Sequence, residues 1–299
     1  MNRKKVKRIF KTTVLAIVLV CSYFQYPLFS SANIKWETDW ENSLKNAAEK
    51  KQPVFMDFYT DWCPPCKKLV KITFKDKNVI DYFKKENYLL IKVNPEKDRV
   101  AEEKFKVYSY PTLVIFNAKG AEIDRLLGYH DPEELTKALE DVKKGIGTLE
   151  DLLSRYEKAK REKTENTTKG FQLMFKIMDK YIARADYPDA LTFVAQIVEL
   201  DKDNAQKQAS AALYKKGYIY YKWKKYKEAV DAMLSIHKIY PDSQEAASGY
   251  GAAAYYAEKM GDTAGTLRIL KNFVKDYPTS EYAKKTRKKI KKLEKKAKQ

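Results

Sequence analysis

The motif Trp62-Cys63-Pro64-Pro65-Cys66-Lys67 lies where a predicted strand meets a predicted helix. The run from Val54 to Tyr59 is apolar, β-prone and too short for a helix, so it predicts a buried strand. The run from Lys67 to Phe74 has helical spacing. Because a helix N-terminus favours an anionic sulfur, two cysteines at such a junction are typical of thiol–disulfide chemistry. The motif therefore requires a strand followed directly by a helix that carries the cysteines.

The chain is long enough for two domains and has few cysteines. Its 299 residues can form two ordinary hydrophobic cores, and three cysteines are present. The third, Cys21, lies in the N-terminal segment, so Cys63 and Cys66 are the pair expected in a processed protein. A single pair excludes the disulfide framework found in small secreted domains.

Residues 1–32 have the features of a secretory signal. They contain six basic side chains and no acidic one, an apolar stretch from about Thr12 to Phe24, and small residues before the end at Ala32. This order predicts a signal peptide cleaved after Ala32, since the apolar part is short for a membrane span. The alternative is that this segment stays uncleaved as an N-terminal anchor. Lipid attachment at Cys21 is disfavoured, because Val20 is bulky where a small residue is expected before the cysteine. We therefore expect an exported protein of the periplasm or cell envelope.

Positive charge is concentrated at the two ends of the chain. The net charge is +19, of which residues 33–299 carry +13. The last 16 residues contain ten lysines and arginines against Glu294 alone. We interpret this tail as a solvated helix end; the alternative is association with an anionic membrane surface or an acidic partner. Nucleic-acid binding is not expected, because the sequence has no motif for it.

Residues 33–147 alternate predicted strands with predicted helices. The expected strands are 54–59, 88–93, 112–116 and 123–127, the last two forming a hairpin. The expected helices begin with one in which Trp36, Trp40, Leu44 and Ala48 share a face, and continue at 67–74, 78–86, 99–105 and from Asp131. This order predicts an α/β sandwich with a central sheet flanked by helices.

From about Leu149 onward the sequence predicts helices only and contains an internal repeat. Tyr187-Pro188-Asp189-Ala190 matches Tyr226-Lys227-Glu228-Ala229, and Gly261-Asp262-Thr263 marks a third copy. The middle copy has small residues, an aromatic wedge and a helix breaker at Gly217, Tyr220, Ala229 and Pro241. The pattern resembles tetratricopeptide repeats with a slightly long period. We expect residues 148–299 to form such a helical-repeat domain, ending in the basic tail and docking a protein partner.

The two cysteines are expected to have different tasks. Cys63 precedes the helix and should be the exposed nucleophile, whereas Cys66, one turn inside, should be the shielded resolving thiol. Pro64 suits the first helical position because its missing N–H would be unpaired there. Pro65 removes a second amide, so stabilisation of the thiolate should depend on the Cys66 amide and the helix terminus.

Residues 34–144 resemble the thioredoxin family. The matching positions are Asp57, Trp62, Lys92, Tyr110-Pro111-Thr112 and Gly128, in addition to the cysteines. The resemblance implies a redox disulfide between Cys63 and Cys66, with buried Asp57 assisting deprotonation of Cys66 and Lys92 near that acid. It also implies that Trp62 flanks the site and that the peptide bond before Pro111 is cis. The Tyr110-Pro111 loop would then face the cysteines and seat an extended substrate.

Within this family, residues 52–63, Lys67 and Thr73-Phe74 look most like the C-terminal periplasmic domain of the DsbD thiol:disulfide interchange group. That group fuses its thioredoxin-like domain to a membrane-embedded electron conduit, whereas this sequence carries helical repeats instead. If the resemblance extends to activity, a separate thiol protein must donate or accept the electrons.

The same residues allow other interpretations. A zinc site would need two further ligands, and His130 and His237 fall in different expected domains, so we expect no metal and no cofactor. A purely structural disulfide is disfavoured because so small a loop removes little entropy from the unfolded chain. Asp57 could also be a buried carboxylate without a role in proton transfer.

Tyrosines are frequent in the repeat region, and we interpret them as repeat core. The alternative is a binding stripe on a concave face. The residues concerned are Tyr214, Tyr218, Tyr220, Tyr221, Tyr226 and Trp223.

The sequence therefore predicts an exported thiol–disulfide oxidoreductase that reduces disulfides of envelope proteins. Cys63 would form a mixed disulfide that Cys66 resolves, with Asp57 and Lys92 managing the proton. Two alternatives use the same residues: an envelope scaffold whose thioredoxin-like unit is incidental, and a disulfide oxidant or isomerase.

Overall fold

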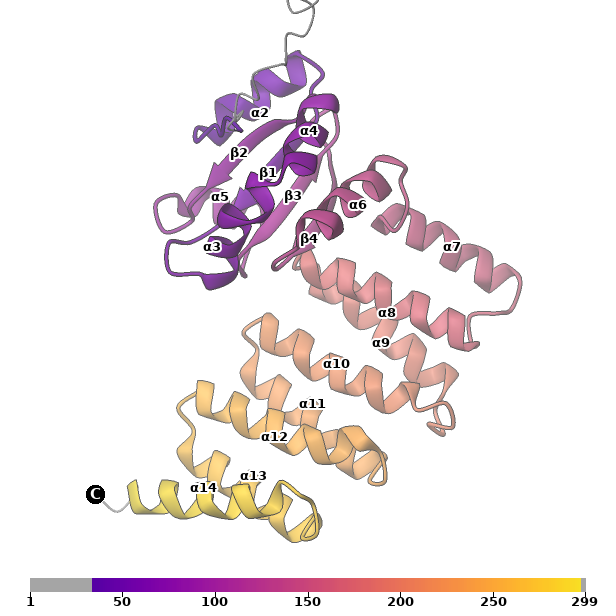
Figure 1. The fold of residues 1–299 in the computed structure, drawn as a ribbon. Helices are drawn as coiled ribbons and strands as arrows, with labels where there is room; N and C mark the ends of the chain where they lie inside the picture. Colours follow the sequence, from indigo (N-terminus) through magenta and orange to yellow (C-terminus); the bar gives the residue numbers. More distant parts are fainter. Residues whose placement is uncertain (1–33, 297–299) are drawn as a thin grey trace, which may run out of the picture. The chain divides into compact units, whose positions relative to one another are not determined.

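The computed structural model describes residues 34–296 (Figure 1), and the chain divides into two units between Lys35 and Trp36. All of the described helices and strands belong to the second unit. The expected signal peptide with Cys21 lies outside the described residues, and so does the end of the basic tail. Within residues 34–296, no helix has the length and apolar character needed to cross a membrane.

A four-stranded sheet with the order β2-β1-β3-β4 organises the first part of this unit. Its strands are β1 (Val54–Phe58), β2 (Leu89–Val93), β3 (Thr112–Phe116) and β4 (Glu122–Leu127). Strands β1 and β2 are parallel, whereas β3 is antiparallel to both β1 and β4. The central strands β1 and β3 are buried at every position, which explains their continuous apolar sequence.

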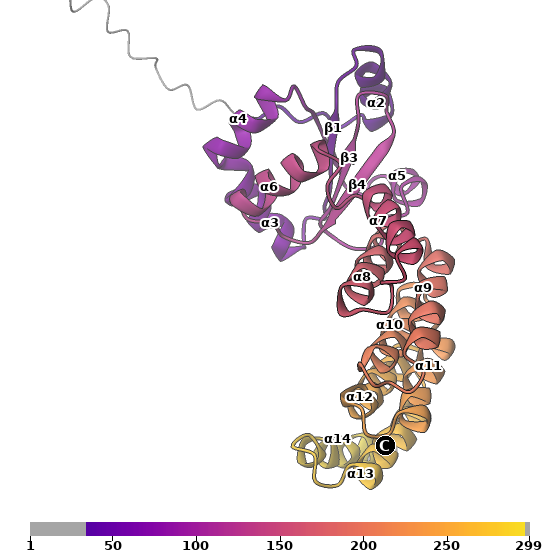
Figure 2. The ribbon, with the colours of Figure 1, turned by 90° about the vertical axis from the view of Figure 1, so that its right-hand side faces the viewer.

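Helices cover both faces of this sheet. They are α2 (Trp40–Glu49), α3 (Pro64–Lys71), α4 (Lys77–Lys85), α5 (Arg99–Lys104) and α6 (Pro132–Lys143), with a 3-10 helix at Thr73–Lys75. Figure 2 shows α3, α4 and α6 on one face and α2 and α5 on the other. The expected α/β sandwich is therefore confirmed.

Side-chain caps define where these helices begin. The Asp131 side chain accepts a hydrogen bond from the Glu134 amide, and the Glu134 carboxylate accepts one from the Asp131 amide. Pro132 occupies the first position of α6. This reciprocal pair satisfies two donors that a helix start would otherwise leave unpaired. The helix start predicted at Asp131 is confirmed.

The prediction that Trp36 lies on the first helix is wrong. That helix begins only at Trp40, where the Asp39 side chain accepts a hydrogen bond from the Asn42 amide. Trp36 precedes an extended residue, Glu37, whose backbone pairs with that of strand β2. The indole of Trp36 instead packs against Phe74, with ring centroids 4.9 Å apart. Helical spacing placed Trp36 on the helix, but the cap at Asp39 stops the helix short of it.

The rest of the described chain is helical, as expected. The helices are α7 (Leu149–Arg161), α8 (Thr168–Ala183), α9 (Tyr187–Leu200), α10 (Gln208–Lys222), α11 (Tyr226–Ile239), α12 (Gln244–Lys259), α13 (Thr263–Asp276) and α14 (Ala283–Lys296). Consecutive helices pack as antiparallel pairs, as Figure 1 shows for α10 to α13. Small residues permit close crossings: a Cβ added at Gly249 of α12 would lie 2.8 Å from the carbonyl oxygen of Met233 in α11.

Strand β4 at the sheet edge contacts α8. The ammonium of Lys180 lies 2.5 Å from the buried carboxylate of Asp124, and the Arg184 guanidinium donates to the carbonyl of Ile123 at 3.1 Å. An edge strand leaves backbone groups unpaired, and side chains of α8 satisfy one of them here.

Candidate functional site

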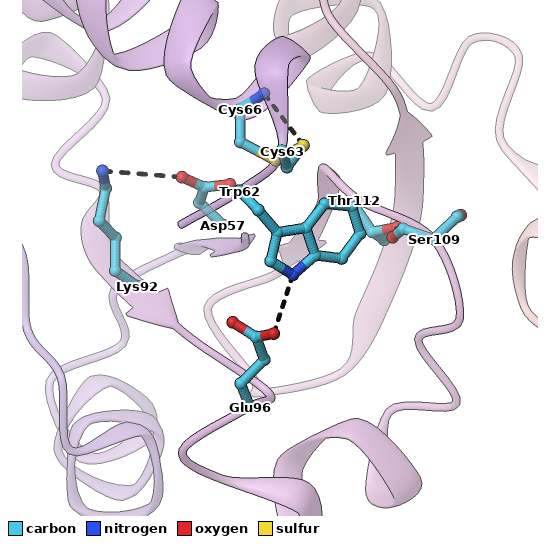
Figure 3. The surroundings of a disulfide bond; sticks show 8 residues. All are labelled: Asp57, Trp62, Cys63, Cys66, Lys92, Glu96, Ser109 and Thr112. Atoms are coloured by element: carbon cyan, nitrogen blue, oxygen red, sulfur yellow. Dashed lines mark hydrogen bonds and ion pairs between the residues drawn. A yellow bond between two sulfur atoms is a disulfide. The ribbon is translucent and has the colours of Figure 1, made fainter. Parts of the chain in front are cut away.

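The two cysteines lie at the start of α3, immediately after β1 and a short turn. They are joined as a disulfide, and their Cα atoms are 5.3 Å apart (Figure 3). Cys63 is the N-cap residue, and its sulfur accepts a hydrogen bond from the Cys66 amide at 3.2 Å. Pro64 and Pro65 take the first two helical positions, so the Cys66 amide is the first N–H of the helix.

Cys63 is more buried than the sequence suggested. It is 2% exposed and Cys66 3%, so the expectation of an exposed Cys63 does not hold for this disulfide form. The Cys63 sulfur is turned back over the first turn of α3, where it bonds to Cys66 and meets the Cys66 amide. The Cys63 sulfur is therefore shielded from solvent in the disulfide form.

Asp57 and Lys92 face each other on neighbouring strands. The parallel register pairs Asp57 of β1 with Lys92 of β2, and their charged groups are 3.8 Å apart. Asp57 is fully buried, and its other oxygen, Oδ1, has no hydrogen-bond partner. Burial raises the pKa of Asp57 to about 7, although the nearby Lys92 charge opposes the rise. In the view of Figure 3, the Asp57 carboxylate is drawn between the ammonium and the disulfide.

Aromatic rings surround the Lys92 ammonium. It lies 4.7 Å from the ring centroid of Trp36, 5.2 Å from that of Tyr59 and 5.5 Å from that of Phe74. Burial lowers the pKa of Lys92, and Asp57 partly offsets the effect. Because the faces of aromatic rings attract a cation, these side chains replace part of the hydration that the Lys92 ammonium loses on burial. This cluster could not be predicted from the sequence, because Trp36 and Phe74 come from distant segments.

The loop before β3 is drawn on the side of the disulfide away from Lys92, where Ser109 and Thr112 lie (Figure 3). The bond between Tyr110 and Pro111 is cis, as the family resemblance implied. The Pro111 carbonyl accepts from the Gly128 amide at 2.9 Å, and Thr112 Oγ1 donates to the Ser109 carbonyl at 2.7 Å. The Tyr110 hydroxyl donates to Glu102 at 2.6 Å, and burial together with this hydrogen bond raises its pKa. The loop is thus held at both ends and through its tyrosine.

Trp62 forms the exposed border of the site. Its side chain is 63% exposed, while its indole N–H donates to Glu96 at 2.8 Å. The ring meets Tyr110 edge to face, with centroids 6.3 Å apart. A large ring held in solvent by one hydrogen bond and one aromatic contact is suited to cover an arriving polypeptide.

The two histidines lie apart from the cysteines. His130 Nδ1 is 3.2 Å from the Gly128 carbonyl, and His237 Nδ1 is 2.8 Å from the Tyr277 hydroxyl. Among residues 34–296, no group of three His, Cys, Asp or Glu side chains is arranged to hold a metal ion.

Fold and site together define a thioredoxin-like domain followed by helical repeats. Residues 40–143 match the family described as thioredoxin-like domain, and residues 211–243 and 247–280 match the tetratricopeptide repeat. The second match covers the middle and last of the three expected repeat copies.

Known relatives resemble the first of these regions. The thiol:disulfide interchange protein DsbD of Pectobacterium atrosepticum is 34% identical over 97 residues, which cover 31% of this chain and 17% of the relative. DsbD of Haemophilus influenzae (strain PittGG) is 31% identical over 118 residues, covering 37% and 20%. The chain thus spans a fifth or less of these relatives. The oxidised C-terminal domain of Neisseria meningitidis DsbD is 20% identical with a TM-score of 0.32, covering 36% of this chain and 98% of that domain.

Proposed function

We propose that this protein is an exported thiol–disulfide oxidoreductase that reduces disulfides of envelope proteins. The observation that carries the proposal is the Cys63–Cys66 disulfide at the start of α3. Buried Asp57 is drawn on one side of it, and Ser109 and Thr112, which flank the cis Tyr110-Pro111 bond, are drawn on the other (Figure 3). A carboxylate with a raised pKa near a cysteine pair is the arrangement that controls a thiol proton.

The first step begins from the reduced pair. The Cys63 thiolate, favoured by the α3 N-terminus and the Cys66 amide, attacks one sulfur of a substrate disulfide. A Cys63–substrate mixed disulfide forms, and the other substrate sulfur leaves as a thiolate that takes up a proton. The Tyr110-Pro111 loop and Trp62 hold the substrate backbone during this exchange.

The second step releases the product. Asp57 accepts the proton of the Cys66 thiol, and the resulting thiolate attacks the Cys63 sulfur. The Cys63–Cys66 disulfide forms, and the second substrate sulfur leaves and is protonated. Lys92 holds Asp57 partly ionised through its charge at 3.8 Å, so that Asp57 can act as a base near neutral pH.

Two electrons pass from the cysteine pair to the substrate in each cycle. A separate dithiol protein must therefore reduce the Cys63–Cys66 disulfide before the next cycle. The tetratricopeptide repeats would dock a protein, either this donor or the substrate.

The test is to trap the mixed disulfide at Cys63. In a Cys21→Ser background, reduced Cys66→Ala protein is mixed with a peptide disulfide and examined by mass spectrometry. We expect one peptide attached to Cys63, and its removal by dithiothreitol. The matched control is Cys63→Ser with Cys66 intact, which should trap far less. Equal trapping in both variants would contradict the proposed order of attack. No trapping in either variant would favour the scaffold interpretation.

A further inference from the structure

The loop that precedes the cis-proline touches the helical repeats. Lys106 in this loop forms an ion pair with Asp186, at the turn between α8 and α9, with a separation of 2.8 Å. Two residues on, the Tyr108 ring lies 5.8 Å from the ammonium of Lys224, in the turn between α10 and α11. The segment expected to seat the substrate therefore borders directly on the first two repeat turns.

Tyrosines continue from this loop onto the repeats. Tyr187 is buried at the start of α9, and its hydroxyl donates to the Lys222 carbonyl at 3.2 Å. Burial raises the pKa of Tyr187 to about 12, and its ring lies against Trp223 with centroids 5.6 Å apart.

Further tyrosine rings follow along α10 and α12. Tyr221 follows Tyr218 by three residues, so both lie on one face of α10. The Tyr221 hydroxyl is 3.3 Å from that of Tyr255 in α12, and its ring stacks on Tyr256 at a centroid distance of 4.5 Å. Tyr108, Tyr218, Tyr221 and Tyr255 form one surface, called here the tyrosine row.

Three of the four tyrosines in the row are open to solvent, whereas Tyr221 is partly buried against the core of the repeats. Tyr108 is 46% exposed, Tyr218 37% and Tyr255 44%. Half-exposed rings that also carry a hydroxyl provide apolar area and hydrogen bonds at a low cost in conformational entropy. The core interpretation is confirmed for Tyr214, Tyr220 and Tyr221, which pack against the buried cluster of the repeats. The alternative of a binding stripe fits the exposed Tyr218 better.

Lysines border the row and lack acidic partners. Lys224 lies beside Tyr108, and Lys259 lies 5.4 Å from the Tyr255 ring. Neither of these two exposed lysines forms an ion pair with a carboxylate of residues 34–296, whereas Lys106 and Lys215 are paired with Asp186 and Asp179. Unpaired positive charge beside exposed rings is complementary to a negatively charged polypeptide.

We propose that the tyrosine row binds an acidic, extended segment next to the reactive cysteine of the protein substrate. This inference rests on the proposed function and names its substrate class. A substrate held at the Tyr110-Pro111 loop continues past Tyr108 onto Tyr218 and Tyr255, where its carboxylates meet Lys224 and Lys259. The row increases affinity for such substrates and leaves the sulfur chemistry at Cys63 unchanged.

The test compares three synthetic substrates with the same cystine-containing core. One has no tail, one has an aspartate-glycine tail of about eight residues, which reaches roughly 26 Å when extended, and one has a lysine-glycine tail of equal length. Tails are placed on either side of the core in separate peptides. Reduction by the full chain is followed with dithiothreitol as electron source, and kcat and KM are determined at low and moderate salt.

For the wild type we expect a KM for one acidic-tailed peptide about tenfold below that of the tail-free peptide, rising with salt, at similar kcat. Lys224→Glu with Lys259→Glu, and separately Tyr218→Ser with Tyr255→Ser, should remove this advantage while leaving the tail-free kinetics unchanged. The matched control, Lys288→Glu with Tyr282→Ser, changes an exposed lysine and an exposed tyrosine away from the row and should keep the advantage.

The outcomes separate the two proposals. Equal KM values for acidic and basic tails, or an equal loss in the control variant, would overturn the tyrosine row while reduction of the tail-free peptide still supports the oxidoreductase. A preference for the basic tail would also overturn the row. Failure to reduce any of the peptides would overturn both.

Discussion

Asp57 and Lys92 form an ion pair of 3.8 Å across adjacent strands, and the carboxylate is fully buried while one of its oxygens has no hydrogen-bond partner. A buried carboxylate whose oxygens are not all hydrogen-bonded lowers the free energy of unfolding. Such groups are found where the carboxylate has a task in catalysis. In the proposed cycle that task is to accept the Cys66 proton. The pair therefore connects stability and activity through a single titration.

The contribution of Asp57 to the free energy of unfolding of the oxidised protein should fall as pH rises from about 4 to about 7. The pKa of Asp57 is raised from 3.8 in the unfolded chain to about 7 in the folded protein, so the folded state binds more protons in this interval. Asp57→Asn removes this titration and should be the more stable protein above pH 7, by at most about 4 kcal/mol. The measurement is the free energy of unfolding in urea across this pH range.

The difference between the two proteins isolates Asp57 from the other carboxylates and the histidines. A difference that does not change between pH 4 and pH 8 would show that the pKa of Asp57 is not raised.

The release of product should follow the ionisation of Asp57. Reduced protein and a peptide disulfide should react in two phases in stopped flow, the second being attack by Cys66. We expect the rate of this phase to increase with pH around 7. In Asp57→Asn the rate at pH 7 should fall by at least about tenfold, which is somewhat less than is typical for loss of a general base. The first phase, attack by Cys63, is the internal control. An equal effect on both phases would indicate a general disturbance of the site.

Trp62→Ala should weaken substrate binding without destabilising the fold. The ring is mostly exposed and contacts Tyr110 at 6.3 Å, so a bound polypeptide would bury it. Loss of one aromatic contact is worth about 0.5–1.5 kcal/mol, which corresponds to a rise in KM of roughly two- to tenfold. Trp62→Phe should recover most of the affinity, although it lacks the hydrogen bond to Glu96. A large fall in thermal stability with unchanged KM would contradict this role.

Two glycines of α12 should respond in opposite ways to alanine. At Gly249 a new Cβ would lie 2.8 Å from the Met233 carbonyl oxygen, so Gly249→Ala must push α11 and α12 apart. We expect a loss of about 1–3 kcal/mol in unfolding free energy. At Gly251 a Cβ would meet no atom within 4 Å, so Gly251→Ala should gain about 0.5–1 kcal/mol from helix propensity. Similar effects at both positions would refute the close packing of these helices.

The sequence was sufficient to predict the layers of the fold because local signals agree. The short apolar run of β1, the prolines at the start of α3 and the Asp131 cap each identify an element without tertiary information. The cis bond before Pro111 was reached through family resemblance and was confirmed.

Features set by distant contacts were not predictable in the same way. Trp36 has helical spacing with Trp40, yet the cap at Asp39 starts the helix after it. The rings around Lys92 and the contact of Lys106 with Asp186, 80 residues later, depend on how separate segments pack. Cys63 is likewise buried in the disulfide form, although its position before the helix predicted an exposed side chain.

The most direct test of the central claim is the reduction of insulin disulfides by the purified protein with dithiothreitol as electron source. We predict that the wild-type protein accelerates reduction well above dithiothreitol alone, and that Cys63→Ser lowers the rate to that background while its circular dichroism spectrum is unchanged. A Cys63→Ser protein that reduces insulin as fast as the wild type would contradict the assignment of Cys63 as the nucleophile.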